Sequence, residues 1–289
     1  MKTNLIILVS LFVLSGAMAQ RLNRFQNTKA VDSFFSLKDT GKHPLILAHR
    51  GGPGPLDTEN SIVTFNKTAQ RLPNAIIEMD VRMTADSTFV LLHDPTLDRE
   101  SDAKGAVAER TLRELTKVKL KTLSGALTGQ AMPTFTDVLT WNRNRYMLAL
   151  DVKPGTDPIR VMKEVEKHGA VHSVFVICYS MAEAQRVRDQ YPTLWLAVGV
   201  NNMADLDRFE TSQLVSGQRL IALTPQKLQP ASFYERLRKL GVPASVGTYG
   251  AGQLDEKPMA EATGGYREIV RQGGDIITTD RPVDVSALF

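Results

Sequence analysis

Cysteine is almost absent from this chain of 289 residues, and Cys178 is the only one. A single cysteine can form no internal disulfide, so the hydrophobic core alone must hold the fold. Cys178 lies in the apolar run VFVICYS. We expect it to pack there as a small apolar side chain.

Strong charge is also lacking. The formal net charge is +4, and the Lys and Arg residues are scattered rather than clustered. A protein that binds nucleic acid usually carries a dense basic patch. We therefore expect no nucleic-acid partner.

The sequence has only one long apolar run, LIILVSLFVLSG, at its start. The run is shorter than the roughly 20 residues that span a membrane. Lys2 precedes it, and Ala17, Met18 and Ala19 follow in the small-x-small form of a signal-peptidase site. We expect residues 1–19 to be a signal peptide cleaved near Ala19, so that the protein is exported (periplasmic or secreted) without a stable membrane anchor. An uncleaved N-terminal anchor is the alternative.

Residues 20–43 read as a polar lead-in with one short helix, and residues 44–289 as one α/β domain. Short, almost continuous apolar runs recur along this domain, which is typical of parallel strands covered on both faces. The runs are LILAH, AIIEMDV, TFVLLHD, YMLALDV, VFVICYS, LWLAVGV, LIALT, PASVGTY and DIITTD. The second and third are separated only by a short polar loop, which predicts a local hairpin. Eight β/α units remain, and we predict a (β/α)8 TIM barrel.

The stretches between the runs have helical patterns. They are SIVTFNKTAQRL, DPIRVMKEVEKHG, SMAEAQRVRDQYP, PASFYERLRKLG and GYREIVRQGG.

Residues 94–135 do not fit a minimal barrel. We interpret them as a small insertion over the catalytic mouth, with TLRELTKVKL as a helix. An insertion with no role in the site is the alternative.

Chemically active side chains follow four successive apolar segments. They are His49 and Arg50, Glu78 and Asp80, His93, and Asp151 and Lys153. Each alone has a structural explanation, such as a buried histidine or a surface ion pair. In a TIM barrel, however, the carboxyl ends of all strands meet at the active-site mouth. We therefore expect these side chains to converge.

Three carboxylates at one mouth repel one another unless a cation joins them. Oxygen ligands suit Ca²⁺ or Mg²⁺, and Zn²⁺ ranks lower for such a set. Arg50 and Lys153 beside a metal ion form a site for a phosphate group. His49 and His93 can then act as general acid and general base. This combination indicates cleavage of a phosphodiester.

The segments HRGG, TENS, IIEMDV, LLHD, PTFTDVL, LALDVK and DIITTDRP together resemble the motif series of glycerophosphodiester phosphodiesterases, from about Leu45 onward. The resemblance implies a TIM barrel with His49 and His93 as catalytic residues. It further implies that Arg50 binds the phosphate of the substrate and that Glu59 belongs to the same polar network. Glu78, Asp80 and Asp151 would hold Ca²⁺ or Mg²⁺. The implied reaction, part of glycerol and lipid metabolism, releases glycerol 3-phosphate and an alcohol from a small-molecule glycerophosphodiester.

Two positions depart from the family pattern. Asp151 stands where most members have Glu, and VGTYGAG places Thr248 and Tyr249 where a Trp-Thr motif is common. The first departure leaves the metal ion open, and the second leaves the substrate alcohol open. The sequence also leaves open which histidine is the base, whether water or the glycerol 2-hydroxyl attacks, and the oligomeric state.

Two other functions compete with this one. Phospholipase D-like cleavage of lysophospholipid or sphingolipid head groups uses a related barrel but needs an apolar mouth, and residues 94–135 show no strong apolar patch. A non-catalytic exported binding protein would be marked by loss of a histidine or a metal-binding carboxylate, and none is lost.

Overall fold

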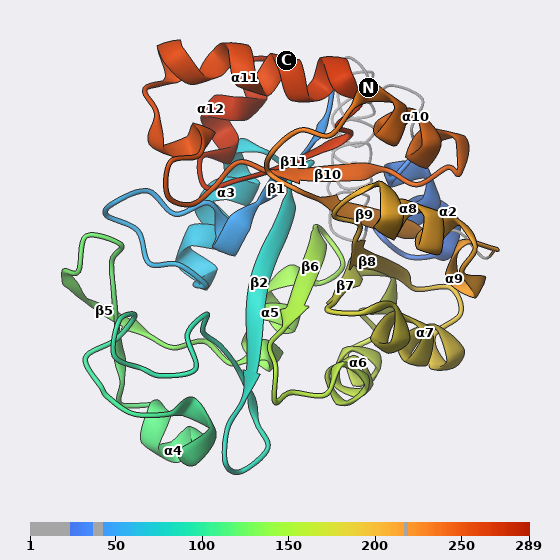
Figure 1. Ribbon diagram of the computed structural model, residues 1–289. Coiled ribbons are helices and arrows are strands. Elements are labelled where there is room, and N and C mark those ends of the chain that lie inside the picture. Colours follow the sequence, from blue (N-terminus) through green and yellow to red (C-terminus); the bar gives the residue numbers. More distant parts are fainter. Residues whose placement is uncertain (1–23, 37–42, 217–218) are drawn as a thin grey trace, which may run out of the picture.

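Eight parallel strands close into a barrel in the computed structural model, which describes residues 24–36, 43–216 and 219–289 (Figure 1). The barrel strands are β1 (Leu45–Ala48), β2 (Ile76–Met83), β6 (Met147–Val152), β7 (Val174–Cys178), β8 (Trp195–Gly199), β9 (Leu220–Thr224), β10 (Ala244–Gly247) and β11 (Ile276–Thr279). Strand β1 pairs with both β2 and β11, which closes the ring. The predicted TIM barrel is confirmed. The predicted signal peptide, residues 1–19, lies outside the described residues.

The expected hairpin is present as β2 and β3 (Phe89–Leu91), which pair antiparallel with Val81 opposite Leu91. The backbone N–H of Leu92 then donates to the carbonyl oxygen of Asp80 at 3.2 Å. The hairpin therefore returns the chain to the barrel mouth and places His93 beside the carboxylates of β2.

Helices surround the barrel and begin largely where the sequence predicts. They are α3 (Ile62–Arg71), α5 (Phe135–Asn142), α6 (Pro158–Lys167), α7 (Met181–Gln190), α8 (Met203–Glu210), α9 (Gln213–Ser216), α10 (Ala231–Lys239), α11 (Met259–Gln272) and α12 (Pro282–Ser286). Ser61, Asp157 and Ser180 cap three of these helices with their side chains. Helix α11 begins six residues earlier than predicted. A Cβ on Gly265 would lie 2.6 Å from Leu254, so the glycine that weakened the helical pattern allows close packing.

The lead-in closes the end of the barrel opposite the site. Its one expected helix is α2 (Thr28–Phe34). Phe25, Val31 and Phe35 pack against side chains at the beginning of the strands, including Met147 and Trp195. Asp32 accepts a hydrogen bond from the Trp195 indole at 3.0 Å. This end of the barrel is filled by apolar packing, which leaves the opposite end for chemistry.

Cys178 is buried in the main core, as expected. Burial raises the pKa of its thiol to about 12. The thiol is therefore neutral at pH 7 and packs as an apolar group. Among the residues described, no helix combines the length and the apolar character that crossing a bilayer requires.

The insertion lies between β3 and α5 and has its own small core. It contains the short 3-10 helix η2 (Val107–Glu109), α4 (Leu112–Leu115), β4 (Lys119–Lys121) and β5 (Leu127–Ala131). The predicted helix over TLRELTKVKL is wrong after its first turn. The alternation of Lys119, Leu120 and Lys121 has the period of a strand, and Leu120 is buried while its neighbours are not. Pairing with β5 therefore replaces the second helical turn.

Candidate active site

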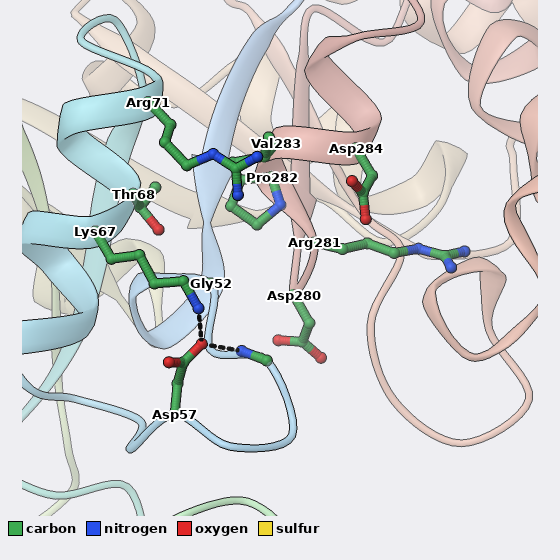
Figure 2. Close-up of a pocket in the computed structure, with 11 residues that line it drawn as sticks. Gly52, Asp57, Lys67, Thr68, Arg71, Asp280, Arg281, Pro282, Val283 and Asp284 are labelled. Carbon is green, nitrogen blue, oxygen red and sulfur yellow. Dashed lines mark hydrogen bonds and ion pairs between the residues drawn. The ribbon is translucent and has the colours of Figure 1, made fainter.

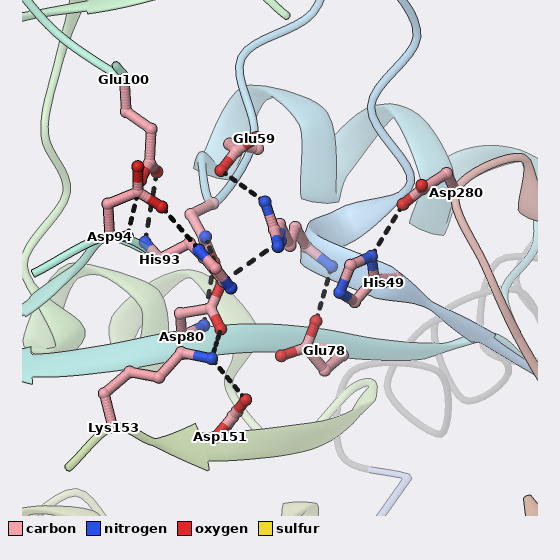
Figure 3. Close-up of polar contacts among 12 residues, drawn as sticks. His49, Glu59, Glu78, Asp80, His93, Asp94, Glu100, Asp151, Lys153 and Asp280 are labelled. Atoms are coloured by element: carbon pink, nitrogen blue, oxygen red, sulfur yellow. Dashed lines mark hydrogen bonds and ion pairs between the residues drawn. The ribbon is translucent and has the colours of Figure 1, made fainter. Parts of the chain in front are cut away.

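The structure brings all the predicted site residues to one end of the barrel (Figure 3). His49 and Arg50 lie in the 3-10 turn η1 (His49–Gly51) after β1, and His93 follows β3. Asp80 of β2 and Asp151 of β6 are register partners in adjacent parallel strands. The two carboxylates therefore emerge side by side.

Glu78, Asp80 and Asp151 each offer an oxygen atom within 4.8 Å of the others. Glu78 and Asp80 are buried, and Asp151 is half-buried. Burial, and then the charges of Asp80 and Asp151, raise the pKa of Glu78 well above its ordinary value. A divalent cation between these oxygens would remove that repulsion, so the donor set fits a hard metal ion.

Two groups already hold the carboxylates in place. The ammonium of Lys153 lies 2.6 Å from both Asp80 Oδ1 and Asp151 Oδ2. Burial disfavours the charged form of Asp80, but Lys153 and Arg50 bring its pKa below the ordinary value. Asn60 donates to Asp80 Oδ2 at 2.6 Å and accepts from the Asp80 N–H at 2.9 Å. This residue of TENS, which the sequence pattern did not single out, fixes the orientation of Asp80.

His49 is held on two sides. Its Nδ1 lies 2.8 Å from Asp280 Oδ1, and its ring stacks on Tyr249 with centroids 3.7 Å apart. Asp255 supports this arrangement by accepting from the Asp280 N–H at 2.7 Å and from the Thr248 hydroxyl at 2.9 Å. Because Nδ1 is engaged, Nε2 is the nitrogen left for substrate.

His93 is held from the insertion. Its Nδ1 lies 2.7 Å from Asp94 Oδ1, and Arg99 donates to both oxygens of Asp94. Burial lowers the pKa of His93, while the hydrogen bond with Asp94 opposes that shift. Arg99 also pairs with both oxygens of Glu59, at 3.0 and 2.8 Å. Glu59 in turn accepts from Arg50 Nη1 at 3.0 Å.

One guanidinium, that of Arg99, thus connects the partner of His93 with the partner of Arg50. Glu100, which is buried, completes the group by accepting from the backbone N–H groups of His93 and Asp94. Burial, and then the charge of Glu59, raise the pKa of Glu100 to about 8. The insertion therefore contributes directly to the geometry of the site.

The two glycines after Arg50 have a packing role. Gly51 and Gly52 adopt positive φ values of 89° and 73°. A Cβ would lie 2.5 Å from the Phe65 ring at Gly51 and 2.4 Å from Pro282 at Gly52. A larger residue at either position would therefore strain the turn. The turn lets the Arg50 N–H donate to Glu78 Oε2 at 2.6 Å while its side chain reaches Glu59.

A cavity of about 170 Å³ opens beside His49 and is lined by residues of β1, β2, β6, β7, β9, β10 and β11 and of the turns that follow them. Its lining includes His49, Glu78 and Asp151 together with Gln226 and Tyr249. At the outer edge, the Tyr179 hydroxyl donates to Asp151 Oδ1 at 2.6 Å, with more than half of its side chain exposed.

A second cavity, of about 180 Å³, is lined by Asp280 and by residues of α3 and α12 (Figure 2). Its charged lining residues are Asp57, Asp280, Asp284, Lys67, Arg71 and Arg281. Lys67 is paired with Asp57. Acidic and basic groups are equal in number, so this cavity has no net charge to select an anion.

Glu59 lies in the polar network, as the resemblance implies, and Tyr249 lies in the wall of the cavity beside His49. Seven further site residues were not predicted: Asn60, Asp94, Arg99, Glu100, Tyr179, Asp255 and Asp280. A usable signal existed for Asp280, which follows directly after β11 in the quoted run DIITTD. The rule that strand ends carry the chemistry applies to that strand as well.

Comparison with known proteins places these features in context. The model of the glycerophosphoryl diester phosphodiesterase family matches residues 49–242. YhdW of Bacillus subtilis is 31% identical over 158 residues, which are 53% of this chain and 64% of that protein. The chain spans slightly less than two thirds of the length of the curated relatives that it matches first.

Two solved structures share the architecture. A glycerophosphoryl diester phosphodiesterase from Parabacteroides distasonis superposes with a TM-score of 0.82 at 30% identity, over 92% of each chain. An Oleispira antarctica phosphodiesterase in complex with the product sn-glycerol-3-phosphate has a TM-score of 0.67 at 18% identity. That match covers 85% of this chain and 96% of the other, and it supports the fold.

Proposed function

The chain belongs to the glycerophosphoryl diester phosphodiesterase family, and from this premise we propose that it hydrolyses glycerophosphodiesters to glycerol 3-phosphate and an alcohol. The observation that carries the proposal is the arrangement of two imidazoles, one on either side of the carboxylate cluster (Figure 3). Each imidazole has its Nδ1 held by its own aspartate. Such a pair can accept a proton on one side of a phosphate and donate one on the other.

Glu78, Asp80 and Asp151 are the residues that would hold the divalent cation, with Ca²⁺ or Mg²⁺ preferred over Zn²⁺ for an all-oxygen set. When bound, the cation supplies positive charge to the phosphate oxygens. Arg50 and Lys153 add the charge of this chain's own side chains to the same group. Glu59 orients Arg50, and Asn60 orients Asp80.

We assign the base to His49 and the acid to His93. His49, with Asp280 at its Nδ1, would take a proton from the nucleophile on the glycerol side of the phosphate. The lowered pKa of His93 makes its protonated form a stronger acid, which would donate a proton to the leaving alcohol. The nucleophile is either water or the glycerol 2-hydroxyl, and a cyclic phosphate product would identify the second.

The cavity beside His49 is the proposed position of the glycerol end of the substrate. It combines carboxylates with Thr224, Gln226 and Ser245, and apolar strand residues complete the wall. The O. antarctica phosphodiesterase, which has the same fold, carries sn-glycerol-3-phosphate. The alcohol end would then face the insertion, where His93 and Arg99 lie.

The test uses residues 20–289, stripped with a chelator and assayed on glycerophosphodiesters and lysophospholipids with Ca²⁺, Mg²⁺ or Zn²⁺ added singly. We expect metal-dependent release of glycerol 3-phosphate, lost in His49→Ala and in His93→Ala. Wild-type turnover in both variants would overturn the mechanism. Turnover of lysophospholipid with no turnover of glycerophosphocholine would favour the phospholipase D-like alternative. Tight binding with no turnover under any metal would favour a binding protein.

Export is proposed separately. A signal peptide at residues 1–19 predicts a mature chain that begins at Gln20. Mass spectrometry of the protein from the periplasm or the medium should find this N-terminus. An intact Met1 in the cell pellet would contradict export.

A further inference from the structure

Three exposed leucines lie in the two loops at the insertion side of the mouth. Leu56 is 80% exposed in the loop between η1 and α3. Leu123 and Leu127 are 46% and 59% exposed, in and just after the turn between β4 and β5. Isolated exposed leucines are common, but a contiguous exposed apolar group indicates an interaction site.

Backbone hydrogen bonds join the two loops that carry these leucines. The N–H of Leu123 donates to the carbonyl of Asp57 at 3.0 Å, and the N–H of Ser124 donates to that of Pro55 at 3.0 Å. Leu56 lies between the two accepting residues. The two loops form one edge, which lies at the left of Figure 1, and we call Leu56, Leu123 and Leu127 the leucine rim. The sequence showed no strong apolar patch in residues 94–135, but Leu123 and Leu127 of this segment are exposed in the structure.

The charged side chains of the β4–β5 ribbon itself are all positive, while Asp57 follows Leu56 in the neighbouring loop and Asp102 accepts from the Lys119 N–H at 2.9 Å. Lys121 is the register partner of Leu127, and Lys119 is the partner of Ala131, so each pair shares a face of the β4–β5 ribbon. Leu127 and Ala131 are exposed on that face. Residues 119–131 contain two lysines and no Asp or Glu. Apolar side chains beside lysines are typical of surfaces that bind the boundary of an anionic membrane.

We propose that the leucine rim docks the protein onto an anionic lipid surface. The leucines would enter the boundary between head groups and acyl chains, while Lys119 and Lys121 would face lipid phosphates. A second copy of this chain fits less well, because a self-complementary contact would bring the lysines of both copies together.

The rim is continuous with the site. Three residues after Leu56, Glu59 accepts from Arg50, and the Thr58 hydroxyl donates to Gln130 of β5 at 2.8 Å. Docking at the rim would therefore bring the side of the mouth that faces the alcohol end toward the lipid. Delivery of lipid-borne phosphodiesters to the site rests on the proposed function, whereas docking itself does not.

The test is sedimentation of the mature protein with vesicles of phosphatidylcholine alone or mixed equally with phosphatidylglycerol. We expect binding to the anionic vesicles, reduced about tenfold or more in the variant Leu56→Asp/Leu127→Asp. Lys119→Gln/Lys121→Gln should weaken binding in a way that mimics added salt. Met203→Asp is the matched control, because Met203 is exposed in α8 on the other side of the barrel and should bind as wild type (Figure 1).

Equal sedimentation of wild type and the rim variant would overturn the proposal, as would loss of binding in Met203→Asp. A rim variant that changes the oligomeric state in solution, without changing lipid binding, would assign the rim to a second copy instead. Turnover of soluble glycerophosphocholine distinguishes failure of the docking proposal from failure of the proposed function. The rim variant should keep that turnover, and its absence in the wild type would count against the function alone.

Discussion

Replacing Asp280 by Asn removes the charge that holds His49 without changing the size of the side chain. The bond from His49 Nδ1 to Asp280 Oδ1 is 2.8 Å long, and the two side chains are 13% and 38% exposed. A hydrogen bond to a charged group contributes about 1.5–3 kcal/mol. Because Asp280 is partly solvated, we take the lower part of that range, about 1.5–2 kcal/mol.

If this interaction is fully used in the transition state, kcat falls about 10- to 30-fold. The loss is larger if the Asn amide holds the imidazole in the other tautomer. KM should change little, because Asp280 contacts His49 rather than the proposed phosphate site. The assay is steady-state release of glycerol 3-phosphate at saturating metal, with the melting temperature measured in parallel.

Asp284→Asn is the matched control. Asp284 lies four residues further along, in α12, is exposed, and lines the second cavity with Asp280 (Figure 2). It should keep wild-type kcat. Full activity in Asp280→Asn would refute the reasoning, and so would an equal loss in both variants, because the effect would then be general to this segment.

Three further predictions concern stability and the metal. The pKa of His93 is lowered on folding, so the unfolded chain binds its proton more readily, and stability should rise with pH up to about 6.5. His93→Gln should flatten that rise in denaturant unfolding, and parallel curves would contradict it. Gly51→Ala should destabilise by about 2–4 kcal/mol through a positive φ and contact with Phe65, whereas Gly129→Ala, where a Cβ meets nothing, should cost far less. Chelator should abolish turnover and lower the melting temperature, and added Ca²⁺ or Mg²⁺ should restore both. A melting temperature that does not change when metal is added would argue against metal binding at the carboxylate cluster.

Much of the fold was predictable because the strands are buried on both faces and therefore stand out as apolar runs. The hairpin was predictable because its connection is too short for a helix. The helix over residues 111–120 failed since local propensity competed with pairing to β5, which no local pattern records. In α11, Gly265 weakened the helical pattern, so the first turns of the helix were not predicted. The glycine is required because Leu254 packs against it, which only the fold shows.

The residues of the site also fall into those that the sequence predicts and those that it does not. His49, Glu78, His93 and Asp151 lie at the ends of apolar runs, so the rule that strand ends carry the chemistry identifies them from sequence alone. Arg99 lies in a loop and Asp255 in the short 3-10 helix η4 (Leu254–Glu256), and their sequence neighbours give no sign of the side chains that they contact. Their function as supports depends on side-chain geometry between distant segments, which spacing along the chain cannot express.

The pairing of His49 with Asp280 also constrains how the protein is made. The two residues are separated by 231 positions, and they meet because β1 and β11 are neighbours in the closed barrel. During synthesis, His49 leaves the ribosome long before its partner exists. The histidine can be oriented only after the final strand has been added, so a partly synthesised chain lacks a complete general base. Closure of the ring would thus couple the beginning of activity to the completion of folding.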